Sequence, residues 1–202
     1  MSRPSPSGRS SPSARTLRII GGTWRGRRLR FPPTPEIRPT PDRVRETLFN
    51  WLGLRVPGAR CLDLFAGSGA LGLEAISRGA AHVTFVERDP AAAREIAARL
   101  IEWGARTADV VQTDARGFLE RTPAAVFDIV FLDPPFASAL LAETAARLEH
   151  GGWLTDDALI YIECPAAAAA PPIPSAWAPL KAKRAGEVGY HLYSRARGTD
   201  DE

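Results

Sequence analysis

The stretch CLDLFAGSGALGLEA, Cys61 to Ala75, predicts a short apolar strand, a glycine-rich turn and then a helix. Gly67 and Gly69 allow a tight turn and let a ligand approach the backbone N–H groups at the start of the helix. Together with Gly72 they also match the GxGxxG pattern of dinucleotide-binding oxidoreductases. That pattern alone is a weak signal, so other features of the chain must decide which nucleoside-like ligand binds here.

Acidic residues stand at the ends of four predicted strands. Asp63 precedes the glycines, and the strand HVTFVE ends in Glu87. DVVQTD ends in Asp114, and FDIVFLD ends in Asp133. The carboxyl ends of parallel strands form the edge where open α/β sheets bind ligands, and an acidic side chain at Glu87 can accept both hydroxyls of a ribose. We therefore expect the four carboxylates to surround one ligand, although any one of them alone fits a solvated strand end.

The run FDIVFLDPPF, residues 127–136, predicts a site for a flat ring that carries an amino group. Asp133 offers a carboxylate that only accepts hydrogen bonds, and Pro134 and Pro135 lack an N–H, which leaves carbonyls that also only accept. Phe136 can lie flat on a nucleobase. Acceptors that hold the hydrogens of an exocyclic amine favour its attack as a nucleophile. The purely structural alternative is a Pro-Pro turn in which Asp133 caps the next helix.

With LRIIGGTWRGRRLRFP and RPTPDRVRETLFNWL nearer the N-terminus, these motifs closely resemble the RsmD family of class I S-adenosylmethionine-dependent methyltransferases. That family methylates the exocyclic 2-amino group of a guanine, G966, in 16S ribosomal RNA. The likeness runs from about Leu17 to Arg195. It implies a Rossmann-like α/β fold: a mostly parallel seven-stranded sheet with helices on both faces and a small N-terminal hairpin and helix extension.

The resemblance also implies a cofactor, a partner and a set of site residues. The cofactor is S-adenosyl-L-methionine, and the partner is small-subunit ribosomal RNA within an assembled or assembling subunit. The implied cofactor site consists of Asp63, Phe65, Ala66, Gly67, Ser68, Gly69, Glu87, Arg88, Asp114 and Ala115. The implied catalytic residues, which hold the target guanine, are Asp133, Pro134, Pro135 and Phe136. No metal is needed. Whether Asp133 removes the amine proton or only orients the amine stays open.

Positive charge is concentrated at the N-terminus. Residues 1–45 contain eleven arginines and two acidic residues, whereas the whole chain has a net charge of only +3. Such an arm can lie along RNA phosphates. The expected RNA-binding residues are Arg18, Trp24, Arg25, Arg27, Arg28, Arg38, Arg43 and Arg45. Trp24 could stack on unpaired bases or pack on the main domain, and the arginines on the following helix could simply be solvated.

Four segments are expected: a disordered basic Ser/Pro-rich tail (1–15), an RNA-binding hairpin and helix (16–55), the methyltransferase domain (56–197) and an acidic tail (198–202). The helix of the second segment has Thr40 as its predicted N-cap and Pro41 at its first position. In the third segment, strands alternate with helices, which demands a parallel sheet. A closing antiparallel hairpin, 181–184 with 187–195, suits a seven-stranded methyltransferase sheet rather than a six-stranded oxidoreductase domain.

The cysteines and the distribution of apolar residues exclude few functions. Cys61 and Cys164 have no metal-binding spacing, and the chain contains no apolar run long enough to span a membrane, so we expect a cytoplasmic protein. Two alternatives stay open on sequence alone. One is an adenine 6-amino methyltransferase acting on DNA or RNA, which could use the same DPPF chemistry. The other is a non-catalytic RNA-binding assembly protein.

Overall fold

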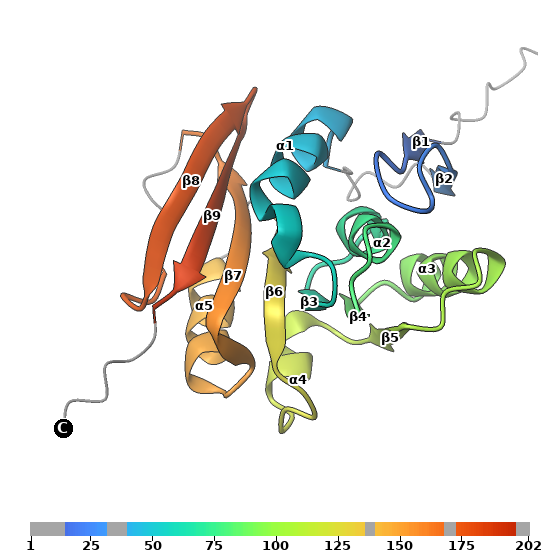
Figure 1. The fold of residues 1–202 in the computed structure, drawn as a ribbon. Coiled ribbons are helices and arrows are strands. Elements are labelled where there is room, and N and C mark those ends of the chain that lie inside the picture. Colours follow the sequence, from blue (N-terminus) through green and yellow to red (C-terminus); the bar gives the residue numbers. More distant parts are fainter. Residues whose placement is uncertain (1–14, 32–39, 136–139, 168–172, 197–202) are drawn as a thin grey trace, which may run out of the picture.

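The computed structural model describes residues 15–31, 40–135, 140–167 and 173–196, and its centre is a seven-stranded sheet (Figure 1). The strand order is β5-β4-β3-β6-β7-β9-β8. Adjacent strands from β5 to β7 pair in parallel, whereas β9 is antiparallel to both β7 and β8. The strands are β3 (Arg60–Asp63), β4 (His82–Glu87), β5 (Ala108–Gln112), β6 (Phe127–Leu132), β7 (Leu154–Pro165), β8 (Trp177–Ala185) and β9 (Val188–Arg195). The predicted mostly parallel sheet and its closing hairpin are confirmed.

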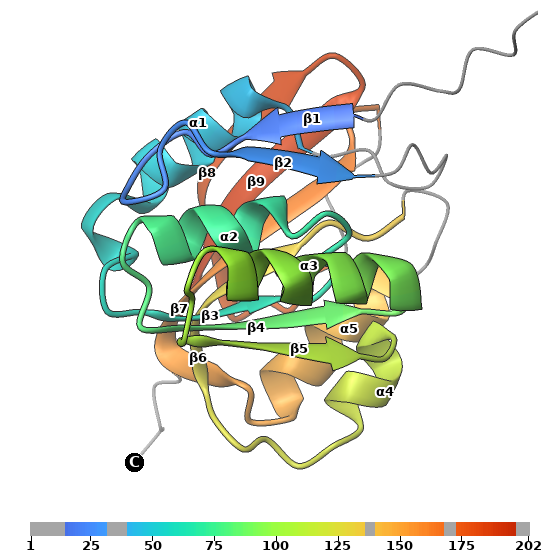
Figure 2. The ribbon, with the colours of Figure 1, turned by 90° about the vertical axis from the view of Figure 1, so that its right-hand side faces the viewer.

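Helices cover both faces of this sheet, as predicted (Figure 2). One face carries α1 (Asp42–Leu52), α2 (Ala70–Ser77) and α3 (Pro90–Glu102). A short 3₁₀ turn, η1 (Gly53–Arg55), follows α1. The antiparallel hairpin of β1 (Arg15–Arg18) and β2 (Arg28–Phe31) lies beside α2 on the same side. The other face carries α4 (Ala115–Leu119) and α5 (Leu140–His150). Among the described residues, none of the helices is long and apolar enough to cross a membrane.

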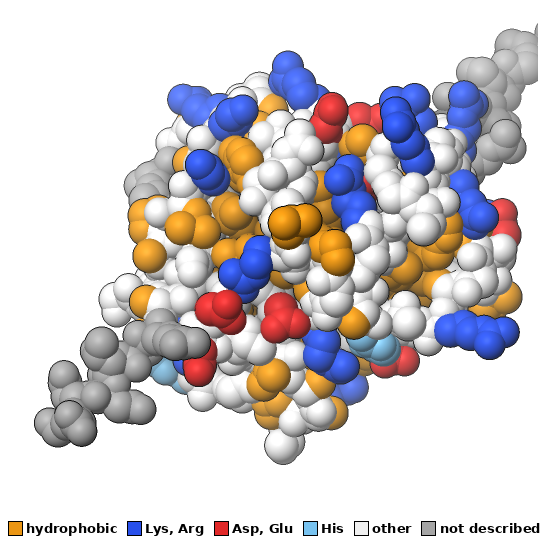
Figure 3. Space-filling model, viewed as in Figure 1, with side chains coloured by type: hydrophobic (Ala, Val, Ile, Leu, Met, Phe, Trp, Pro, Cys, Tyr) orange, Lys and Arg blue, Asp and Glu red, His pale blue; other side chains and the backbone are white. Residues whose placement is uncertain are grey.

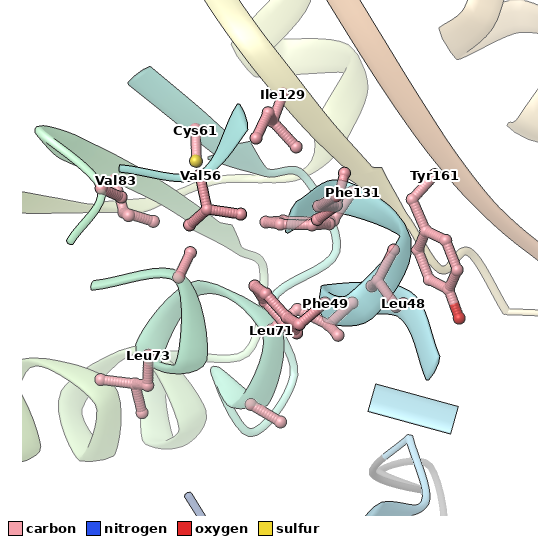
Figure 4. Close-up of a cluster of buried hydrophobic side chains, with 14 of the residues drawn as sticks. Leu48, Phe49, Val56, Cys61, Leu71, Leu73, Val83, Ile129, Phe131 and Tyr161 are labelled. Atoms are coloured by element: carbon pink, nitrogen blue, oxygen red, sulfur yellow. The ribbon is translucent and has the colours of Figure 1, made fainter. Parts of the chain in front are cut away.

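The core on the α1 face joins the hairpin and the helices to the sheet. Phe131 of β6 and Tyr161 of β7 pack against Leu48 and Phe49 of α1, and all four side chains are buried (Figure 4). Burying each such side chain contributes roughly 1.5–3 kcal/mol. Gly72 lets α2 lie directly on β4, because a Cβ there would come within 2.2 Å of the Phe85 ring. The third glycine of the turn motif therefore serves helix–sheet packing.

A buried carboxylate fastens the hairpin to this core. Glu74 of α2 is fully buried and accepts hydrogen bonds from the backbone N–H groups of Ile20 and Gly21, each at 2.8 Å. Arg78 donates to the same carboxylate at 2.7 Å, and the fully buried Arg45 of α1 reaches it at 3.4 Å. Hairpin, α1 and α2 therefore share one charged group.

The structure corrects two sequence predictions at α1. Arg45 was expected to reach RNA, but its guanidinium bonds to Asp42, Glu74 and the carbonyl oxygens of Arg18 and Thr40, and no part of its side chain is exposed. Burial lowers the pKa of Arg45, although Asp42 and Glu74 oppose the shift. Thr40 was expected to cap α1, but Pro41 occupies the N-cap and the Thr40 hydroxyl donates to Glu163 instead.

The proposed division into four segments stays a prediction. The hairpin and α1 pack into the same core as the sheet. Residues 1–14 and 197–202, which include nearly all of both expected tails, lie outside the described residues.

We expect Glu74→Ala to lower the free energy of unfolding by about 3–5 kcal/mol, because it removes one of the two carboxylates paired with the buried Arg45 and leaves the N–H groups of Ile20 and Gly21 without their acceptor. Urea unfolding followed by circular dichroism measures this loss. The matched control is Glu95→Ala on α3, which removes a half-exposed ion pair with Arg99 and should cost less than about 1 kcal/mol. Equal losses in the two variants would show that Glu74 does not hold the hairpin.

Candidate active site

The glycine turn between β3 and α2 lies against the end of β4. Gly67 and Gly69 have φ angles of +52° and +74°, which other residues rarely adopt. The Gly67 N–H donates to Glu87 Oε2 at 2.6 Å, and the Asp89 N–H donates to Glu87 Oε1 at 2.8 Å. Glu87, which is predicted to bind a ribose, is therefore in contact with the glycine turn that is predicted to bind the same ligand.

Asp63 ends β3 and is buried below this turn. Its Oδ2 accepts the Gly72 N–H at 3.0 Å, so the carboxylate also fixes the first turn of α2. Burial raises the pKa of Asp63 to about 7, and the nearby Glu87 and Glu163 carboxylates push it in the same direction against the Gly72 hydrogen bond. A carboxylate held in this way would gain from a cationic ligand, which replaces some of the lost hydration.

Asp133 lies directly after β6, the strand next to β3. Asp63 pairs with Phe131 across the two strands, so Asp133 comes two residues beyond the partner of Asp63. Burial raises the pKa of Asp133 well above its usual range, and Glu163 and Asp63 raise it further. Pro134 is buried and Pro135 is exposed. The fourth member of the predicted motif, Phe136, lies outside the described residues.

Glu163 is a buried acidic residue to which the sequence analysis gave no role. It lies on β7, is 3% exposed, and its Oε1 accepts hydrogen bonds from the hydroxyls of Thr40 and Tyr161, each at 2.9 Å. The available signal was a charged residue inside the otherwise apolar run ALIYIEC, since such residues are rarely buried without partners.

The remaining predicted cofactor residues lie at the same edge. The exposed Asp114 follows β5 and caps α4 by accepting the Gly117 N–H at 2.7 Å, while Ala115 is buried. The Thr113 N–H donates to the Glu87 carbonyl, which ties the β5 loop to the end of β4. Around the turn, Ala66 is buried, Phe65 and Ser68 are partly exposed, and Arg88 is exposed. The binding roles of these residues stay predictions.

Five of the arginines predicted to bind RNA are exposed, namely Arg18, Arg25, Arg27, Arg28 and Arg43. Lys and Arg side chains gather along one border of the molecule, over the hairpin, α1 and β8 (Figure 3). Arg38 lies outside the described residues. On β8, Lys181, Lys183 and Arg184 are also exposed and were not predicted to bind RNA.

The tryptophan of the hairpin does not face solvent. Trp24 is 8% exposed and meets Trp103 edge to face, with 5.1 Å between the ring centroids. The Arg27 guanidinium covers both rings, at 6.0 Å from Trp24 and 5.5 Å from Trp103. The expectation that Trp24 stacks on RNA bases is therefore wrong for this conformation, and the alternative that it packs on the main domain is correct.

A mostly parallel sheet of this strand order, with a glycine turn and acidic strand ends at one edge, defines a class I methyltransferase. The chain belongs to the family described as "Conserved hypothetical protein 95", whose profile matches residues 17–194. Relatives at 50% and 43% identity, both named ribosomal RNA small subunit methyltransferase D, confirm the resemblance to the RsmD family and show that the protein is a methyltransferase.

Several relatives have solved structures or established names. The chain is 50% identical over 188 residues to the ribosomal RNA small subunit methyltransferase D of Escherichia coli (strain K12), covering 92% of this chain and 93% of that protein. The putative methyltransferase yhhF from Escherichia coli has 49% identity and a TM-score of 0.83, covering 90% of this chain and 99% of that chain. An RNA methyltransferase from Salinibacter ruber, solved with S-adenosyl-L-homocysteine, shares the fold at 16% identity, with a TM-score of 0.62 over 82% of this chain and 98% of that chain.

The raised pKa of Asp63 predicts a pH effect on stability. Between the ordinary value of 3.8 and about 7, the folded protein holds a proton on Asp63 that the unfolded chain releases, so this group's contribution to stability falls as pH rises through that window. Asp63→Asn keeps an acceptor for Gly72 but cannot ionise. Urea unfolding without cofactor should show this variant gaining on the order of 2 kcal/mol over the wild type between pH 5 and pH 8. If the free energies of unfolding of Asp63→Asn and wild type changed in parallel with pH, Asp63 would not be a buried, neutral group in the folded protein.

Proposed function

We propose that the protein transfers a methyl group from S-adenosyl-L-methionine to the exocyclic 2-amino group of a guanine in small-subunit ribosomal RNA, G966 by the family likeness. The names of its close relatives support a small-subunit ribosomal RNA methyltransferase. The observation that carries the chemistry is the turn of Asp133 and two prolines at the end of β6, beside the buried Asp63 of β3.

The residues at the edge of the sheet fit this cofactor. When bound, S-adenosyl-L-methionine supplies an electrophilic methyl group on a positively charged sulfur. The buried Asp63 lies below the glycine turn, where a cationic ligand would favour its charged form and lower its raised pKa, and Glu87 stands at the strand end where an acidic side chain can accept ribose hydroxyls. Asp114 and Ala115 would contact the adenine.

The chain's own residues then hold the nucleophile. Asp133 and the Pro134 carbonyl accept the amine hydrogens, which directs the nitrogen lone pair toward the methyl group. The positive charge that develops on the nitrogen lies in the negative field of the neighbouring carboxylates, and this field favours the transition state over the ground state. An unstacked guanine is required to reach this edge, and Phe136 is the residue proposed to stack on its ring.

The exposed arginines supply the RNA contacts in this proposal. The exposed Arg25, Arg28 and Arg43 belong to the hairpin and to α1, which lie on one face of the sheet (Figure 1). Arginines pair with phosphates without reading sequence, so they would orient the RNA while the edge of the sheet holds one base. The partner we propose is an assembled or assembling small subunit, which would place the protein in the cytoplasm.

The test is transfer of labelled methyl from S-adenosyl-L-methionine to unmethylated small ribosomal subunits, free small-subunit RNA and duplex DNA, followed by digestion to nucleosides. We expect label in 2-methylguanosine from a ribosomal substrate. Label in 6-methyladenosine would replace the target while keeping the class of enzyme, and it would contradict the proposal.

The matched variant is Asp133→Ala, which removes an acceptor of the amine hydrogens. We expect no transfer in the same assay, while calorimetry shows cofactor binding within a few-fold of wild type. The control is Asp128→Ala, at the opposite end of β6, where the carboxylate accepts the Arg60 N–H and should not affect transfer. An Asp133→Ala protein that loses cofactor binding but transfers normally once loaded would overturn the assignment.

A further inference from the structure

Asp133 and Glu163 occupy matching positions on neighbouring parallel strands. Leu132, the last residue of β6, pairs with Ile162 of β7, and the residue that follows each of them in the chain is a carboxylate, Asp133 just past the end of β6 and Glu163 within β7. Side chains alternate between the two faces of a sheet, and Leu132 and Ile162 belong to the core on the α4 and α5 face. Glu163 is therefore directed to the opposite face, under α1, and the backbone of Asp133, one residue past the paired Leu132, lies about one strand spacing (~4.8 Å) from it. Among neighbouring charges, Glu163 has the largest effect on the pKa of Asp133, which it raises.

Glu163 is held rigidly in this position. The Thr40 hydroxyl approaches from the start of α1 and the Tyr161 hydroxyl from the same strand, and both donate to Oε1 at 2.9 Å. These two hydrogen bonds lower the pKa of Glu163 against the larger effect of burial, which raises it. The two donors stabilise the charged form of Glu163 and fix its direction.

We propose that Glu163 is a positioning residue: its fixed carboxylate makes Asp133 the acceptor of the proton that leaves the guanine amine, rather than a hydrogen-bond acceptor alone. The inference rests on the proposed function. Two adjacent carboxylates withdrawn from water cannot both ionise at low cost, so the less stabilised member of the pair has the higher proton affinity. With Glu163 held by two hydroxyls, that member is Asp133.

A second carboxylate near Asp133 also raises its pKa. Asp63 on β3 adds a second negative charge that raises the pKa of Asp133. Tyr161 on β7 also feels the Asp133 charge, and burial, the larger effect, keeps it neutral by raising its pKa well above the usual range. The buried cation of α1, Arg45, is paired with Asp42 and Glu74.

The proton balance of the step is simple. The amine nitrogen forms its bond to the methyl carbon while the carbon–sulfur bond breaks, and that bond's electron pair stays on the sulfur. The nitrogen then carries an excess proton, which moves to the Asp133 carboxylate and later to water. A carboxylate with a raised proton affinity is the stronger base and therefore the better acceptor for this transfer.

The direct test is titration of Asp133 by NMR of its labelled carboxyl carbon in the free protein. Glu163→Gln keeps an oxygen that accepts both hydroxyls but removes the charge. We expect the Asp133 midpoint to fall by at least about one pH unit in this variant. The control is Glu149→Gln, which removes a carboxylate bonded to Trp177 and Arg195, and it should leave the Asp133 midpoint unchanged.

The pH dependence of methyl transfer to small subunits provides the second readout. The acid limb of the rate should move to lower pH in Glu163→Gln together with the Asp133 midpoint, and the plateau rate should fall. An Asp133 midpoint that is the same in Glu163→Gln and wild type would overturn the inference, as would a shifted midpoint with an unchanged rate profile. Failure of the proposed function can be told apart from failure of this inference. If the proposed function is wrong, the wild-type protein yields no 2-methylguanosine, but the NMR titration still shows whether Glu163 changes the pKa of Asp133.

Discussion

The central physical constraint in this protein is the crowding of buried carboxylates at one edge of a parallel sheet. Asp63, Asp133 and Glu163 come from the adjacent strands β3, β6 and β7, and burial raises the pKa of each. Such an arrangement is unfavourable in the free protein, since each charge loses hydration and repels the others. It becomes favourable when a cation or an amine enters, so the edge is preorganised for the chemistry of methyl transfer rather than for stability.

A second cluster of buried charged groups connects the helices that pack beside this edge of the sheet. Glu74 and Arg45 are buried together and connect α2, α1 and the hairpin. Because α1 begins beside Thr40, which bonds to Glu163, and its Arg45 bonds to Glu74, this helix is attached both to the buried carboxylate of β7 and to the cluster that holds the hairpin. Among the arginines whose side chains are described between residues 16 and 45, Arg45 is buried and builds the fold, whereas Arg18, Arg25, Arg27, Arg28 and Arg43 are exposed.

Much of this architecture could be predicted from sequence, because the alternation of strands and helices and the glycine turn depend on local chain order. Asp63, Glu87 and Asp133 were predicted from the same logic, since parallel strands bring their carboxyl ends to one edge. The failures depend on tertiary contacts. Arg45 lies on α1 at a position that looked solvated, and only the distant Glu74 explains its burial.

Trp24, Thr40 and Glu163 show the same limit. Each has a plausible local role as an exposed aromatic ring, a helix cap or an ordinary strand residue, and each is instead used by a partner far away in sequence. Trp24 packs on Trp103, and the Thr40 hydroxyl bonds to Glu163. Sequence patterns do not encode which long-range partner a side chain meets, and the register between β6 and β7 is a tertiary feature of the same kind.

The most direct test of this account is a crystal structure with S-adenosyl-L-homocysteine bound. The account predicts the amino acid end of the ligand beside Asp63 below the glycine turn, the ribose hydroxyls on Glu87, and the sulfur directed toward Asp133. A ligand bound elsewhere, or one whose sulfur is directed away from Asp133, would contradict the assignment of this edge as the active site.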